Sequence, residues 1–351
     1  MEEKVFTKEE KEKLRKERQK RRKYRLLILL LLMLGTGTML ATSTYAWFTS
    51  NKNVSVESLK VNIEAKNGIQ ISADATNWKS IVQKTDLVGA KTGKYANAIN
   101  QIPEILEPVS TTGIPDAGKL PMYYGVVESD EETGNYILTS TKTTELDNNT
   151  TRENDDQDPA KFIAFDLFFK VKSETKISLQ AGSGVSAVTA EGEQDTGIKN
   201  AARIAFIVEG SLADGTALDT IQALNGGTNA IIWEPNAGSH TAAGVAQARD
   251  VYNKSTTEGD TNPALTYVGV KSAITLENKV LLNSEDTNYF TAVDPTIKTN
   301  KGFDANVDLL TLSAGITKVR VYMWVEGQDV DCENNASGGQ ISFDLKITTP
   351  A

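Results

Sequence analysis

The most constraining feature of this sequence is the alternation of apolar and other residues along several separate segments. In the segment FIAFDLFFKVK, Ile163, Phe165, Leu167, Phe169 and Val171 occupy five successive alternate positions. This period of two is typical of a β-strand that buries one face. The same pattern recurs at Val54–Ile63, Ile69–Ala73, Ile204–Val208, Val319–Val325 and Ile341–Ile347. Strands separated by turns predict an all-β chain built as an antiparallel sandwich.

The gaps between these strands are long and polar. They include an acidic segment from Asp147 to Asp158, and three stretches that favour short helices. The expected helices span Tyr95–Leu106, Thr216–Leu224 and Ala242–Tyr252. No fixed-period repeat is visible, so residues 47–351 are expected to form one sandwich domain that carries long insertions.

Charge is distributed unevenly along the chain. The first 25 residues contain 12 Lys/Arg and 6 Asp/Glu, a net charge of +6, whereas the whole chain carries −9. The remaining residues therefore carry −15. An acidic body argues against nucleic-acid binding, which needs basic surfaces to neutralise phosphate. It suits a solvated surface outside the cytoplasm.

The chain has one cysteine, Cys332, and one histidine, His240. A single cysteine cannot form an intramolecular disulfide, and a single histidine excludes His-rich zinc motifs. His240 lies in a Gly/Ala loop and is interpreted as a surface residue. Cys332 is flanked by acids that disfavour a thiolate. The sequence therefore predicts a protein that is not an enzyme and has no cofactor, apart from the calcium considered below.

An apolar run follows the basic segment of residues 1–25. Leu26 to Phe48 is long enough to span a bilayer, yet its strongly apolar part, Leu26–Leu34, has the length of a signal-peptide core. Small residues precede two candidate cleavage positions, after Ser43 and after Ala46. Residues 26–46 are therefore expected to be a cleaved signal peptide, with an uncleaved transmembrane helix as the alternative. Basic residues before the run predict a cytoplasmic N-terminus and an exported body.

One acidic cluster near the C-terminus invites a calcium hypothesis. Asp329, Asp331 and Glu333 alternate as at the start of an EF-hand loop, but Asn334 and Gln340 replace its glycine and its final glutamate. A solvated hairpin turn is the alternative interpretation.

A second candidate site is the polar-looking face of the strand at 319–325. Arg320, Tyr322 and Trp324 alternate with the apolar residues and would point away from the core. Exposed aromatic residues indicate either a partner surface or a face covered by an insertion.

Two blocks resemble a known group of proteins. The junction TYAWFTSN (44–51) resembles the processing site of TasA and camelysin-like proteins of Gram-positive bacteria, which use a dedicated signal peptidase. VYMWVEGQDVDC (321–332) is similar to a block in secreted proteins with the same signal type. By this resemblance, Thr44, Tyr45 and Ala46 supply the recognised end and Trp47 begins the mature chain.

The resemblance implies a jelly-roll domain that builds biofilm-matrix fibres by strand exchange. Trp47, Phe48, Val54 and Val56 would then form the strand donated to a neighbouring copy. The expected function is an exported, cell-surface fibre or matrix subunit that forms homo-oligomers or filaments, in contact with the membrane and a signal peptidase before processing. The alternative is a membrane-anchored monomer that binds a sugar, a protein or calcium through its loops.

Overall fold

The computed structural model describes residues 54–64, 68–90, 95, 98–130, 132–143, 161–189, 194–250, 268–281, 286–300, 302–332 and 338–349. All of them belong to the second of the chain's two units, Ala46–Ala351. The described part is mostly β-structure, with short helices only, and it confirms the prediction of an all-β sandwich-like fold. Within it, no helix is long and apolar enough to cross a membrane.

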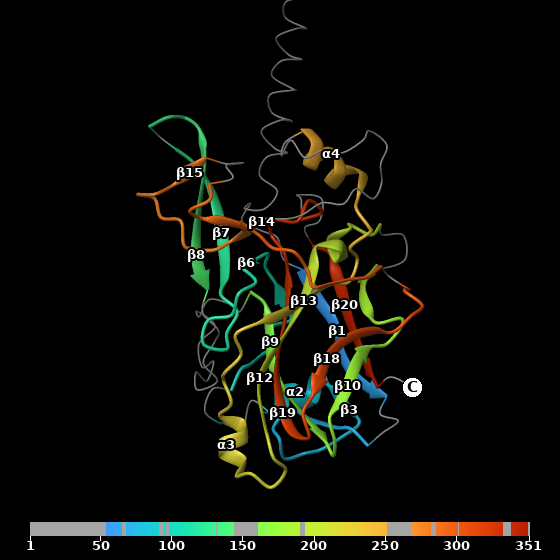
Figure 1. The fold of residues 1–351 in the computed structure, drawn as a ribbon. Coiled ribbons are helices and arrows are strands. Elements are labelled where there is room, and N and C mark those ends of the chain that lie inside the picture. Colours follow the sequence, from blue (N-terminus) through green and yellow to red (C-terminus); the bar gives the residue numbers. More distant parts are fainter. Residues whose placement is uncertain are drawn as a thin grey trace, which may run out of the picture. The chain divides into compact units, whose positions relative to one another are not determined.

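The first sheet contains both the first and the last strand of the body. Strand β1 (Val54–Glu64) lies beside β20 (Gln340–Thr348), as Figure 1 shows in blue and red. The order is β18–β10–β20–β1–β3, with β11 also paired to β20 and β5 to β1. The other members of this sheet are β3 (Ile81–Gln83), β5 (Ile105–Leu106), β10 (Thr175–Leu179), β11 (Gly184–Val188) and β18 (Val307–Leu312).

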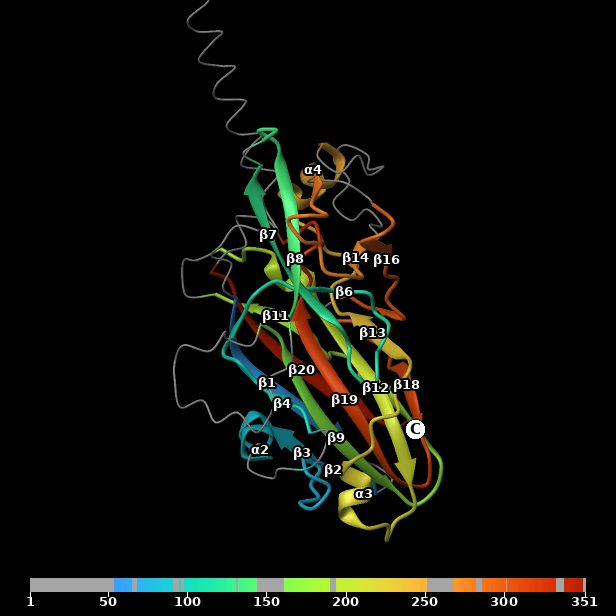
Figure 2. The same cartoon turned by 90° about the vertical axis from the view of Figure 1, so that its left-hand side faces the viewer.

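The second sheet is built around three long antiparallel strands. Strand β19 (Gly315–Val325) lies between β12 (Ala202–Leu212) and β9 (Ile163–Val171), which Figure 2 shows side by side. The order is β17–β13–β12–β19–β9–β2, with β4 also paired to β9. The shorter strands are β2 (Gln70–Ser72), β4 (Asn100–Gln101), β13 (Ala230–Glu234) and β17 (Ile297–Lys298).

The alternating residues of both sheets share one core. The apolar positions of β9, β19 and β20 that the sequence assigns inward all belong to it, together with Val54, Val56, Leu59 and Val61 of β1. Burial of these side chains supplies most of the stabilisation, at roughly 25 cal/mol per Å² of apolar surface removed from water. The predicted strands and their inward faces are therefore confirmed.

Smaller elements decorate the sandwich. Strands β15 (Val280–Leu281), β8 (Tyr136–Thr143), β7 (Met122–Ser129) and β6 (Ser110–Thr111) form one further sheet, and β14 (Val268–Val270) pairs with β16 (Phe290–Ala292). The helices are α2 (Lys84–Ala90), α3 (Leu218–Gln222), α4 (Ala242–Asp250) and the 3₁₀ turn η1 (Ile198–Ala201).

Two of the three predicted helices are present in the described residues. Helices occur within 216–224 and 242–252, as predicted, but the helix predicted at 95–106 is wrong. There, Asn100 and Gln101 pair with β9, and Pro103 lacks the N–H that a helix interior needs. Strands β1 and β2, which precede and follow Asn67-Gly68 in the sequence, belong to different sheets. The acidic segment 147–158 lies outside the described residues.

Candidate functional site

Strand β1, the first described strand of the body, has a long partner strand along one edge and only short partner strands along the other. It pairs in parallel with β20 over nine residue pairs, from Ser55 with Gln340 to Glu64 with Thr348. On its other edge it pairs with three residues of β3 and two of β5. Val54 and Val56, two of the predicted donor-strand residues, are buried in the shared core. Trp47, Phe48 and the junction Thr44–Ala46 lie outside the described residues.

The prediction that Arg320, Tyr322 and Trp324 form a partner surface is wrong. All three side chains are fully buried, as is every residue of β19. The insertions around residues 95–124 and 218–225 cover this face of the sheet. Leu120 donates its backbone N–H to the Tyr322 hydroxyl at 3.1 Å, and Tyr322 and Trp324 pack with Val109 and Met122. The covered-face alternative is therefore the correct one.

Arg320 belongs to a buried ionic cluster that spans three neighbouring strands. The cluster consists of Asp166 on β9, Glu209 on β12, and Lys318 and Arg320 on β19. Arg320 Nε donates to Asp166 Oδ1 at 2.8 Å, and Lys318 Nζ lies 3.2 Å from Asp166 Oδ2. Arg320 Nη1 also lies 3.3 Å from Glu209 Oε1. All four side chains are shielded from solvent, so their charges depend on one another for compensation.

Neutral groups complete this cluster. Tyr95 donates its hydroxyl proton to Asp166 Oδ2 at 3.2 Å, and Ile99 donates its backbone N–H to the same oxygen at 3.3 Å. Lys318 donates to the backbone carbonyl of Gln222 at 2.8 Å. Arg320 donates to the carbonyl of Gly118 and to the side chain of Asn225. The Asp166 carboxylate is therefore contacted by the Tyr95 hydroxyl, the Ile99 N–H, Lys318 and Arg320.

The cluster shifts the pKa values of its members in different directions. Burial alone would raise the pKa of Asp166, but Arg320 and Lys318 outweigh it and hold that pKa below its ordinary value. Burial raises the pKa of Glu209, which Arg320 opposes only in part. Burial lowers the pKa of Lys318, although Asp166 opposes this shift. Asp166 and Arg320 are therefore the firmly charged pair, while Lys318 and Glu209 are biased toward their neutral forms.

A second buried cluster joins β12, β13 and the segment after β19. Arg203 contacts Asp329, and its Nη2 lies 2.6 Å from Glu234 Oε1. His240 Nδ1 lies 2.8 Å from Asp331 Oδ2, and the side chain of His240 is only 5% exposed. The interpretation of His240 as a surface residue is therefore wrong. Asp331 Oδ1 accepts from the backbone N–H and the hydroxyl of Thr241, which fixes the chain at the start of α4.

The geometry of this second cluster argues against calcium at Asp329 and Asp331. Ligand atoms of His240, Asp329 and Asp331 lie within 4.8 Å of one another, the one such grouping in the part of the chain that the structure describes. However, each of the four carboxylate oxygens already faces a protein donor: Arg203, the Asp331 N–H, Thr241 or His240. The guanidinium of Arg203 also repels a cation. Glu333 lies outside the described residues.

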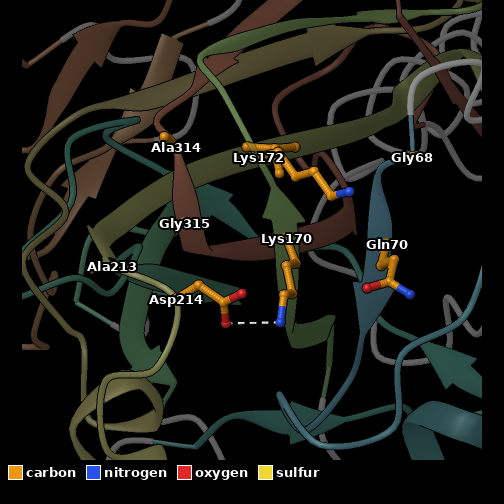
Figure 3. A pocket seen from close by; sticks show the side chains of 9 residues that line it. Gly68, Gln70, Lys170, Lys172, Ala213, Asp214, Ala314 and Gly315 are labelled. Carbon is orange, nitrogen blue, oxygen red and sulfur yellow. Dashed lines mark ion pairs between the residues drawn. The ribbon is translucent and has the colours of Figure 1, made fainter.

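A shallow pocket of about 400 Å³ opens where several strands of the second sheet end. Its lining includes the polar residues Gln70, Lys170, Lys172 and Asp214 together with Val171 and small glycine and alanine residues (Figure 3). Lys170 Nζ pairs with Asp214 Oδ1 at 2.8 Å. More of the pocket's lining is apolar than polar, and Lys172 is a charged lining residue outside this ion pair.

The site residues missed by the sequence reasoning are the buried charges Asp166, Arg203, Glu209 and Lys318. One signal marks Asp166, because it is the one acidic residue in the apolar, phenylalanine-rich segment FIAFDLFFKVK.

Searches of protein-family models, curated proteins and solved structures give no match to this chain.

Proposed function

We propose that this protein is an exported structural subunit of a cell-surface fibre or matrix, which assembles when its N-terminal strand adds to the sheet of a neighbouring copy. The single observation that supports the proposal most is the position of β1. It is the first strand in the part of the body that the structure describes, and it pairs along nearly its whole length with one partner strand. Its departure would expose the main-chain groups of β20 and the core positions of four apolar side chains, which an identical strand could fill.

The pairing of β1 suits an exchange of this kind. The core accepts four apolar side chains of this strand, Val54, Val56, Leu59 and Val61. A replacing strand must therefore present matching side chains in the same register. The opposite edge of β1 is held by five residue pairs in two short strands, so few additional contacts must be broken. The equivalent strand of a second copy regains the same contacts, and exchange therefore has little net cost once both copies participate.

A disulfide across the β1–β20 pair tests this proposal directly. The hydroxyls of Ser58 and Ser342 touch on the outer side of the sheet, so Ser58→Cys with Ser342→Cys places two thiols in contact without altering the core. If β1 is exchanged, oxidation after assembly gives covalent ladders on a non-reducing gel. Oxidation before assembly locks β1 in its own domain and abolishes filaments, and reduction restores them.

The single variants provide the matched control, since Cys332 is buried and remains in every form. Crosslinked monomers recovered from intact filaments would rule out strand exchange. Deletion of residues 47–56 is expected to abolish filaments. N-terminal sequencing of the exported protein separates this proposal from the anchored monomer: a mature chain that begins near Trp47 supports it, and one that begins at Met1 with monomers at every concentration contradicts it.

A further inference from the structure

The buried cluster around Asp166 has a geometry that strand exchange does not require. It lies on β9, β12 and β19, whereas β1 belongs to the other sheet. Lys318 and Asp166 are on adjacent strands, and Lys318 pairs in register with Phe168, two residues beyond Asp166. Both side chains are fully buried, and the nitrogen of one lies 3.2 Å from a carboxylate oxygen of the other. A primary amine and a carboxyl group are thus held together in a dry environment.

We propose that Lys318 and Asp166 condense to form an amide that crosslinks β19 to β9 within one chain. The Nζ–Cγ bond forms and the Cγ–Oδ2 bond breaks. An ammonium and a carboxylate together give an amide and one water molecule, because two of the three Nζ hydrogens leave with Oδ2. No oxidant, cofactor or second substrate is needed. Proximity lowers the barrier to reaction, since two groups held at this distance behave as if at a very high effective concentration.

The donors around Asp166 are arranged as an acyl substitution requires. Arg320 Nε donates at 2.8 Å to Oδ1, the oxygen that becomes negatively charged when the amine adds to Cγ. The Tyr95 hydroxyl and the Ile99 N–H both donate to Oδ2, the oxygen that leaves. Arg320 Nη2 also donates to Oδ2 at 3.3 Å, so both oxygens of the carboxyl group have hydrogen-bond donors.

Proton transfer within the ion pair prepares both groups for reaction. Lys318 Nζ lies 3.2 Å from Asp166 Oδ2, so the ammonium passes one proton directly to that oxygen, which gives a neutral amine and a neutral carboxyl group. Burial favours this transfer because it disfavours both charged forms, and it lowers the pKa of Lys318. The neutral amine is the nucleophile, and its second proton joins Oδ2 as that oxygen leaves as water.

The product also improves the charge balance of the interior. Before reaction, two cations and two anions are buried together. Afterwards the amide is neutral, and Arg320 retains Glu209 as its counterion. Removal of two charges from a dry site relieves a desolvation penalty of several kcal/mol per ion. The chain has a single cysteine, so this amide would serve where a disulfide cannot.

The exposed pair Lys176 and Asp308 supplies an internal comparison. These residues also face each other across adjacent strands, β10 and β18, but their side chains are 51% and 65% exposed. Water solvates both charges there, and apart from Lys176 the carboxylate has one side-chain donor among the described residues, the Ser178 hydroxyl at 3.3 Å from Oδ1. We therefore expect this pair to remain an ordinary ion pair in the same molecules.

Mass spectrometry of the folded, purified full chain tests the proposal. The expected mass is lower than the sequence mass by one water, and a peptide digest should contain one species that joins the segments around Asp166 and Lys318. Lys176 and Asp308 should appear in separate peptides. A full sequence mass after prolonged incubation of the folded protein overturns the proposal. A water loss that maps elsewhere, such as to a cyclised aspartate, overturns it equally.

Two variants separate the reaction from mere packing. Lys318→Arg retains the positive charge but cannot form this amide, so it should show the full mass and migrate more slowly than the wild type on a denaturing gel. Glu209→Gln leaves Lys318 and Asp166 in place, so this variant should fold, as judged by circular dichroism, and still lose one water. Retention of the crosslink in Lys318→Arg would contradict the assignment. If Glu209→Gln fails to fold, the wild-type peptide map still decides the matter.

Discussion

The indole N–H of Trp324 donates a 3.0 Å hydrogen bond to the carboxylate of Glu326, two residues further along the chain. Glu326 is fully buried, and its other oxygen accepts the backbone N–H of Gln328 at 3.1 Å. Burial raises the pKa of Glu326 to about 7, because these hydrogen bonds and the more distant Arg203 offset the loss of solvation only in part. This one contact ties the covered face of β19 to the segment that carries Asp329 and Asp331.

The first prediction concerns stability against pH. The pKa of Glu326 is higher in the folded state than in the unfolded state. Glu326 therefore contributes stability that is fully present below about pH 4.5 and is lost as the pH rises to about 7. The loss amounts to roughly 3 kcal/mol of unfolding free energy. Glu326→Gln removes the charge but leaves one acceptor oxygen for the N–H groups of Trp324 and Gln328, so the variant should lack this pH-dependent loss of stability. Urea unfolding at pH 5 and pH 8 measures both effects; an equal pH slope in wild type and variant would contradict the assignment.

The second prediction uses the single histidine. Burial alone would lower the pKa of His240, but the hydrogen bond to Asp331 and the charges of Asp329 and Asp331 raise it above 6.5. The stability that His240 contributes is therefore present below pH 6.5 and lost as the pH rises through the folded-state pKa. In an untagged chain, NMR should show one imidazole signal with a midpoint above 6.5. Asp331→Asn should lower this midpoint, and Asp294→Asn, which alters an exposed carboxylate, should leave it unchanged.

The third prediction concerns the core contribution of β1. Leu59 is 2% exposed, so Leu59→Ala should lower the unfolding free energy by about 2 to 5 kcal/mol. Glu57 is an exposed residue of the same strand, and Glu57→Ala should change stability by less than about 0.5 kcal/mol. Thermal or chemical denaturation of both variants gives the comparison. Equal effects would show that β1 is not packed against the body in solution.

The fourth prediction concerns Gly315, the first residue of β19. Its φ is +112°, and a Cβ there would lie 2.2 Å from the carbonyl oxygen of Leu212. Gly215 has a φ of +94° with open space around it. Both alanine variants incur the strain of a positive φ, roughly 1 to 2 kcal/mol, but only Gly315→Ala must also displace backbone. Gly315→Ala should therefore unfold at a clearly lower denaturant concentration than Gly215→Ala.

The sequence was most informative where one physical rule dominates. Alternation along β9, β19 and β20 identified the inward face because one side of each strand packs against the opposite sheet. The other face was misjudged at Arg320, Tyr322 and Trp324, since polar and aromatic residues at alternate positions resemble a wet surface. Here they are satisfied by insertions from residues distant in sequence, such as Leu120 and Asn225. No local pattern reveals such long-range coverage.

The same limitation explains the missed clusters. Asp166 and Arg320 are separated by 154 positions, and Arg203 and Asp329 by 126. Their proximity follows from strand register, which depends on the complete fold. The placement of β1 beside β20 follows from the same cause. A sequence pattern shows that each is a strand but does not choose its neighbour.

The parallel pairing of β1 with β20 has a mechanical consequence. The N-terminal end of β1 and the C-terminal end of β20 lie at opposite ends of the pair, since Ser55 is opposite Gln340 and Glu64 is opposite Thr348. A force that pulls these two ends apart acts along the strands and loads the hydrogen bonds of the pair together, in shear, rather than one after another as in unzipping. In a filament of exchanged strands, the donor would pull on β1 through its Glu64 end. Gln340, where β20 joins the rest of the receiving domain, lies at the opposite end of the pair, so tension along the filament would again load the pair in shear and not by peeling.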